Sequence, residues 1–177
     1  MAIEFGKPND NPSMLQMFTR YKAWANNITF GAMSEIPPAE LVKTHKATFG
    51  SIIHTMNHTY VVDDIFKAHL EGRKHSYSAR NTETSPPLHD LRQMCEEMDH
   101  WYITQADQFD ETQLGEIIEF EFVGGGKGAM SRMEIFLHIV NHGTYHRGMI
   151  SNMMQQISVF TAANDLPVFL RDVWNVA

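Results

Sequence analysis

One stretch near the C-terminus constrains the fold more than any other, because it places histidines on the apolar face of a helix. His138, His142 and His146 recur every fourth residue in the sequence HIVNHGTYHRGMI at residues 138–150. A step of four residues advances about 40° beyond one helical turn, so neighbouring histidines stack on one face. The same face carries the apolar residues Ile135, Met149 and Met153. The pattern therefore predicts a helix whose imidazoles point into the protein.

Histidines in such a position need partners for their ring nitrogens, because a buried imidazole without them costs about 1–3 kcal/mol. A divalent metal accepts the nitrogen lone pairs, and the remaining N–H groups donate to nearby acceptors. An earlier apolar helical segment carries His54 and His58, again four residues apart. Two ligands from one helix and one from the other would leave a coordination position open. The residues alone leave open which of the five histidines bind a metal, and whether they are instead hydrogen-bonded core residues.

Three further segments share the helical periodicity of the histidine stretch. The four expected long helices run from Ser13 to before Pro37, over 49–70, over 88–107 and from Ser131 to about 157. Ser13 is a suitable N-cap, Ser131 and Glu134 form a capping box, Gly72 ends the second helix, and Pro86-Pro87 introduces the third. A short turn is expected at 39–42, and a short helix at 165–173.

One segment has a strand pattern instead. Within residues 116–123, Phe120 and Phe122 alternate with glutamates, and a run of glycines at 124–126 permits a tight turn back through 128–130. This glycine run lacks the spacing of a phosphate-binding loop. We therefore expect an all-α protein, a four-helix bundle with a small β-hairpin between the third and fourth long helices.

The connections leave the helix order undetermined, because the polar loop at 73–85 is long enough to cross over the bundle. The length of 177 residues suits one domain spanning 1–177, with an irregular lead-in at 1–12.

Charge and hydropathy exclude several classes of partner. The net charge of −7 argues against nucleic-acid and anionic-membrane binding, and no apolar run approaches the ~18 residues of a membrane span. The N-terminus lacks the order of a signal peptide, so we expect a cytoplasmic protein. The single cysteine, Cys95, is interpreted as a packed thiol. No glutamate follows the first histidine of a His-x-x-x-His pair, which excludes the helical zinc-protease pattern.

Three of these segments together resemble the DinB family, within the DinB/YfiT-like group of metalloenzymes. Residues 138–150 are similar to the family's signature, residues 55–66 (TMNHTYVVDDIF) to its second-helix motif, and residues 21–26 (YKAWAN) to its first-helix motif. The matches occur in the family's order, and the resemblance spans about Leu15 to Leu170. Tyr145 stands where the family often has His or Thr, and Met149 replaces a common Gln.

The resemblance implies a four-helix bundle with a divalent metal held by His58, His142 and His146. His138 and His54 then become supporting residues, and Asp63, Tyr145 and Arg147 are accessory candidates. Asp63 and its neighbour Asp64 are candidate bases, against the alternative of solvated carboxylates. Tyr145, like Tyr60, is a candidate donor to a bound oxyanion, against a core role. Arg147 is a candidate partner for a substrate carboxylate or thiol, against a structural salt bridge.

Relatives of this kind include thiol-dependent transferases and hydrolase-like enzymes. We therefore expect a metal-dependent enzyme that performs thiol-dependent S-transfer or hydrolysis on a small molecule. Zn or Ni is the first choice of metal, with Fe, Mn or Cu as alternatives, and a low-molecular-weight thiol is a candidate cofactor. A homodimer is also implied. The competing hypothesis is a non-catalytic stress-response or metal-binding protein whose metal is structural or regulatory.

Overall fold

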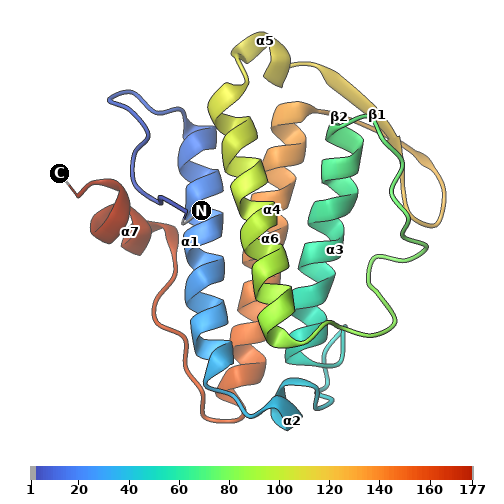
Figure 1. Ribbon diagram of the computed structural model, residues 1–177, viewed down its shortest axis with the longest axis vertical. Coiled ribbons are helices and arrows are strands. Elements are labelled where there is room, and N and C mark those ends of the chain that lie inside the picture. The colour runs from blue at the N-terminus through green and yellow to red at the C-terminus, as the bar shows by residue number, and fades with distance from the viewer. Residues whose placement is uncertain (1–2, 177) are drawn as a thin grey trace.

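The computed structural model describes residues 3–176 and shows four long helices packed side by side (Figure 1). These helices are α1 (Met14–Ser34), α3 (Ile52–Leu70), α4 (Leu88–Gln108) and α6 (Arg132–Gln155). The shorter elements are α2 (Pro38–Leu41), α5 (Glu111–Leu114), α7 (Leu166–Phe169) and a π-helical turn, η1 (Leu170–Trp174). The predicted all-α bundle with a small β-hairpin is confirmed.

The helices begin where their N-terminal caps are. The Ser13 hydroxyl accepts the Gln16 amide at the start of α1, and the Gln16 side chain accepts the Ser13 amide in return. Ser131 and Glu134 form the same reciprocal pair at the start of α6. Each pair satisfies amide donors that the first helical turn leaves without partners. The predicted capping box of the histidine helix is therefore confirmed.

The long helices form a square in which α1 and α3 lie on one diagonal. Helix α1 packs against α4 and α6, and α3 packs against the same two helices. Helices α3 and α4 run in the same direction, so residues 71–87 cross the length of the bundle between them (Figure 1). The helix order that the sequence left open is thus set by a crossover connection.

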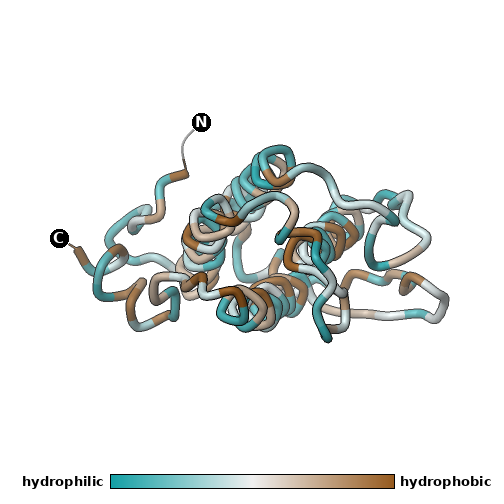
Figure 2. Tube along the Cα trace, turned by 90° about the horizontal axis from the view of Figure 1, so that it is seen from below, coloured by the Kyte–Doolittle hydropathy of each residue, from teal (hydrophilic) through white to brown (hydrophobic). Residues whose placement is uncertain are grey.

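Two antiparallel strands form the hairpin, β1 (Ile117–Glu121) and β2 (Lys127–Ser131), with Phe120 opposite Gly128. The hairpin and the C-terminal segment flank opposite sides of the bundle (Figures 1 and 2). The C-terminal segment places Phe169 and Trp174 in an aromatic cluster with Tyr21 and Trp24 of α1.

The bundle interior has two apolar clusters with a polar layer between them. One cluster, which includes Phe66, Tyr102 and Phe136, extends to the hairpin, and the other includes Phe30, Ile52 and Met153. Along each long helix, buried polar residues stand between these clusters. They are Lys22 and Asn26 on α1, His58 and Asp63 on α3, Asp99 on α4, and His146 and Arg147 on α6. This polar layer contains the candidate site.

Several sequence predictions of element bounds need correction. Helix α3 begins at Ile52 and not at Phe49, because the Ser51 hydroxyl caps it by accepting the His54 amide. Helix α5 was not predicted, and its cap is Asp110. Residues 1 and 2 of the expected lead-in, and residue 177, lie outside the described residues. None of the helices within residues 3–176 is long and apolar enough to cross a membrane.

Candidate metal centre

Three imidazoles from two helices converge in the polar layer. His58 of α3 and His142 and His146 of α6 each place one ring nitrogen within 4.8 Å of the others. The Nε2 atoms of His58 and His142 are 3.1 Å apart, and the rings of His142 and His146 have centroids 4.4 Å apart. The four-residue step on α6 brings its two rings to one face, and α3 supplies the third ring from the opposite side.

A hydrogen bond to the crossover loop orients His58. Its Nδ1 lies 2.6 Å from the backbone oxygen of Arg80. A carbonyl oxygen only accepts, so Nδ1 carries the proton and the Nε2 lone pair is available toward His142. The loop is itself anchored on α3, because the Asn57 side chain donates to Thr82 at 2.6 Å and Asn81 donates to the His54 carbonyl at 3.0 Å. The predicted polar loop therefore supports a site residue.

Phe49 packs against the outer side of the same imidazole. Its ring stacks on His58 with centroids 3.9 Å apart and meets the edge of His146 at 5.5 Å. This contact is possible because residues 49–51 precede the helix instead of forming its first turn. Phe49 thereby shields the imidazoles from water on one side.

The residues present fit a divalent metal ion. Two nitrogens bound to one tetrahedral zinc at about 2.0–2.1 Å lie about 3.3 Å apart, close to the observed 3.1 Å between His58 and His142. Nδ1 of His142 and Nδ1 of His146 are buried and have no hydrogen-bond partner among the described residues. Three neutral imidazoles are donors that Zn, Ni, Fe or Cu accept. The geometry is compatible with metal binding, and the assignment of these histidines as ligands stays a prediction.

Burial keeps the imidazoles neutral. Burial, together with the charge that neighbouring histidines would carry, lowers the pKa of His142 to about 2 and that of His146 to about 4. Neutral imidazole is the form that binds a metal, so protons do not compete with the ion at pH 7.

A pH dependence of stability follows for the metal-free protein. In the unfolded chain these histidines bind protons near pH 6.5, whereas in the folded protein they resist protonation until pH about 4 or lower. Acidification below pH 6.5 therefore favours the unfolded chain. We expect the free energy of unfolding, measured with urea, to fall from pH 7 to pH 5 by at most about 1.4 kcal/mol per pH unit for each histidine. His142→Gln should have a shallower dependence, and an unchanged slope would contradict this account.

A buried network of charges lies next to the histidines. The Lys22 ammonium of α1 contacts Asp63 at 2.7 Å and Asp99 at 2.5 Å, and all three side chains are almost fully buried. Burial would lower the pKa of Lys22, but the two carboxylates raise it above its usual value. Burial also raises the pKa of Asp63 to about 6, against the attraction of Lys22. The network joins α1, α3 and α4 at the level of the site.

Arg147 extends this network to α6. Its guanidinium donates to the Asn26 side chain at 2.9 Å and to the Thr144 hydroxyl at 3.0 Å, and it lies over the Tyr21 ring. Gly143 allows this packing, since a Cβ there would lie 3.0 Å from Nη1 of Arg147 and 3.6 Å from Cε of Lys22. The glycine between the two α6 histidines thus lets α6 sit closely against the network.

Two accessory candidates, Asp63 and Arg147, belong to the buried charge network. Asp63 contacts Lys22 and does not line the cavity beside the histidines, and it is buried, not solvated. Its neighbour Asp64 accepts from Tyr77 and Arg73 at the surface of α3. Arg147 is buried and is held by Asn26 and Thr144, without a salt bridge among the described residues.

The remaining candidates surround the three imidazoles at different distances. His54 contacts the Ser85 hydroxyl at 3.0 Å and stays outside the cluster. Tyr145 is 65% exposed and only touches the edge of His146, and half-buried Tyr60 packs beside the apolar clusters. His138 lies one turn from His142, with ring centroids 5.4 Å apart.

Cys95 is a buried free thiol, as predicted.

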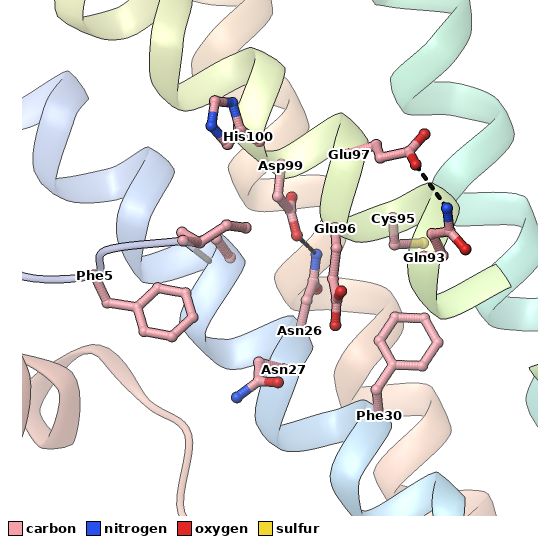
Figure 3. Close-up of a pocket in the computed structure, with 12 residues that line it drawn as sticks. Phe5, Asn26, Asn27, Phe30, Gln93, Cys95, Glu96, Glu97, Asp99 and His100 are labelled. Carbon is pink, nitrogen blue, oxygen red and sulfur yellow. Dashed lines mark hydrogen bonds between the residues drawn. The ribbon is translucent and has the colours of Figure 1, made fainter. Parts of the chain in front are cut away.

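Two cavities in the described part of the chain differ in their relation to the imidazoles. One of about 360 Å³ lies between α3, α6 and the hairpin, and both His58 and His142 line it. The other, of about 670 Å³, lies between α1 and α4, where Asn26 and Asp99 of the charge network form its inner wall (Figure 3). None of the three clustered histidines lines the second cavity. Of these two cavities, the first is the one through which a small molecule could reach the site.

Phe49, Arg80 and Lys22 are site residues that the sequence reasoning missed. Phe49 had been placed inside a helix, and Arg80 within a loop read only as polar. Lys22 carries a signal that could have been noted, since a lysine one helical turn before Asn26, among apolar residues, implies a buried partner. The Arg80 contact uses a backbone oxygen, so no side-chain pattern could have indicated it.

Comparisons with known proteins identify the family of this chain. The DinB family model matches residues 9–172. Protein DinB of Bacillus subtilis (strain 168) is 26% identical over 155 residues, which cover 85% of this chain and 90% of that protein.

Solved structures share the fold. A DinB-like protein from Bacillus cereus ATCC 10987 superposes with a TM-score of 0.62 at 12% identity, covering 83% of this chain and 95% of that one. A conserved protein from Enterococcus faecalis gives a TM-score of 0.58 at 12% identity, covering 82% and 97%.

Proposed function

Because this chain belongs to the DinB family and brings three imidazoles together beside a cavity, we propose that it is a divalent-metal-dependent enzyme acting on a small molecule. His58, His142 and His146 would hold the ion, with Zn or Ni as the first choice. The observation that supports an enzyme over a structural metal protein is that the cavity reaches His58 and His142. A structural site is closed by protein ligands, whereas a catalytic site keeps a position open to substrate.

When bound, the ion would act as a Lewis acid that polarises a substrate atom and lowers the pKa of a coordinated thiol or water. The chain's own residues orient the imidazoles and exclude water from them. The Arg80 carbonyl fixes the tautomer of His58, and Phe49 covers the His58 ring. The charge network beneath Gly143 holds α6 against α1, so that His142 keeps its position.

Two reactions are candidates, thiol-dependent S-transfer and hydrolysis, and the residues that line the cavity favour S-transfer. Among the described residues that line it, none is Asp or Glu, so no carboxylate stands ready to take a proton from water. A thiol, with a pKa near 8.5, needs far less help to ionise than water does. His138 lines the same cavity as a neutral imidazole, and it is the candidate proton acceptor.

Metal-dependent turnover is the expected result of a direct assay. Metal-stripped protein would be reloaded separately with Zn²⁺, Ni²⁺, Mn²⁺, Fe²⁺ or Cu²⁺. Thiol consumption would then be followed with bacillithiol-, glutathione- and mycothiol-like donors and a panel of electrophiles, beside an ester hydrolysis panel. We expect at least about a 100-fold loss of rate on metal removal, as for a site that depends on Lewis-acid activation. His142→Ala and His54→Ala serve as the inactive and active controls.

The non-catalytic alternative makes a different prediction in the same experiment. If no metal restores any turnover and chelation unfolds the protein, the metal is structural. Formation of a homodimer, cytoplasmic location and a one-domain organisation stay predictions.

A further inference from the structure

The cavity between α3, α6 and the hairpin has apolar walls that lead away from the imidazoles. Its apolar lining residues are Val62, Ile65, Phe66, Phe120, Phe122 and Val123. Its volume of about 360 Å³ lies at the low end of the ~300–1,000 Å³ range of small-molecule sites. A cavity of this size accommodates a small molecule, since about 150 Å³ is enough for one aromatic ring, and it is too small for a folded partner or a polymer.

The hairpin fixes the aromatic wall of this cavity. The Phe120 ring stacks on His69 with centroids 4.8 Å apart and meets the edge of Phe66 at 5.5 Å. It can lie over strand β2 only because residue 128 is glycine, since a Cβ there would come within 2.6 Å of the Phe120 ring. The wall is therefore formed before any ligand arrives.

The charge of the lining is confined to one end. Burial lowers the pKa values of His69 and His138, so these rings are neutral at pH 7. Arg80 is the charged residue among the described lining residues, and no described carboxylate pairs with its guanidinium. Arg80 is an exposed residue of the crossover loop, and its backbone oxygen contacts Nδ1 of His58 at 2.6 Å, which places this charged residue at the His58 end of the cavity. The metal end of the cavity is thus positive, while the remainder is apolar and neutral.

We propose that this cavity binds the apolar, aromatic-sized part of an anionic small molecule, and that Arg80 holds the negative charge beside the imidazoles. The inference rests on the proposed function, for which it names the class of substrate. Aromatic walls favour a planar ring through offset or edge contacts. A guanidinium favours a carboxylate or a comparable planar anion.

Three small probes separate the two halves of this proposal. Phenylacetate has the ring and the charge, benzyl alcohol has only the ring, and acetate has only the charge. Dissociation constants would be measured by NMR titration of the full chain, both metal-loaded and metal-free, with the imidazole signals of His69 and His138 as local reporters. We expect phenylacetate to bind at least about tenfold more tightly than either of the others, because ring burial and ion pairing act together.

Variants at the cavity mouth test the location. Phe122 is 51% exposed, so Phe122→Ala removes a cavity wall without opening the core, and Val123→Trp fills the mouth. Ile117→Ala is the matched control, because Ile117 is 62% exposed on strand β1 of the same hairpin and does not line the cavity. We expect the first two variants to weaken phenylacetate binding at least about fivefold and the control to leave it unchanged.

Variants of Arg80 test the charge. Arg80→Gln should weaken the binding of phenylacetate without changing the binding of benzyl alcohol. Arg80→Lys should recover part of the lost phenylacetate affinity. Circular dichroism and bound metal, measured for each variant, show whether the fold and metal binding are kept.

The outcomes distinguish this inference from the proposed function. Equal binding of phenylacetate and acetate, or an equal effect of Ile117→Ala and Phe122→Ala, overturns the cavity inference while leaving the metal site intact. If instead the protein takes up no metal, the proposed function fails. The inference then still stands if metal-free protein binds phenylacetate and the Phe122 and Arg80 variants weaken it.

Discussion

Replacing His142 with alanine is expected to weaken binding of Zn²⁺ or Ni²⁺ by about 100-fold or more. A four-ligand zinc site is worth about 10–16 kcal/mol, so one lost ligand removes about 3 kcal/mol. His142 is central to the cluster, because its Nε2 faces His58 and its ring lies 4.4 Å from that of His146. The measurement is metal content by mass spectrometry after purification without added metal, followed by competition with a chelator. His58→Ala and His146→Ala should have the same effect.

The matched controls are other histidines on the same helices. His54→Ala on α3 and His138→Ala on α6 remove imidazoles that lie outside the cluster, so both should keep stoichiometric metal. Retention of stoichiometric metal by both His58→Ala and His142→Ala would rule out the three-histidine site. Loss of metal from His138→Ala would show that the ligand set is different.

Replacing Lys22 with methionine is expected to lower the free energy of unfolding by about 3–5 kcal/mol, the cost of removing one partner from a buried charge pair. Methionine keeps most of the volume but leaves the Asp63 and Asp99 carboxylates buried without their cation. Urea denaturation at pH 7 measures the loss. Lys43→Met is the control, because its pair with Glu40 is exposed and should contribute less than about 1 kcal/mol.

The pH dependence shows whether charge causes this loss. Without Lys22 the buried carboxylates should have raised pKa values, so the folded variant binds protons more readily than the unfolded chain. Its stability should therefore increase, relative to the parent protein, as the pH falls from 7 toward 5. A loss of equal size at both pH values would mean that packing, and not the uncompensated charges, explains the effect.

Local signals in the sequence were sufficient for the helices and the hairpin. Ser13 and Ser131 marked two helix starts, because a serine hydroxyl satisfies amides that the first turn leaves free. Alternation around Phe120 indicated the strand, and the glycines after it marked the turn. Phe49 shows the limit of such signals, since its apolar side chain fitted the periodicity of a helix that it does not join.

The sequence by itself determined that histidines lie on one helical face, because a four-residue step fixes their angular position whatever surrounds them. It also determined, through the motifs at 21–26, 55–66 and 138–150, the family to which the chain belongs. The residues alone left open which histidine of α3 meets that face, and the resemblance implied His58. The tertiary structure brings His58 to that face, and only the tertiary structure decided what lies around it. Three features join segments that are far apart in the chain: the ion pairs of Lys22, the hydrogen bond from His58 to the Arg80 carbonyl, and the cavity beneath Phe120. Such contacts depend on how the helices pack, which no local sequence pattern specifies.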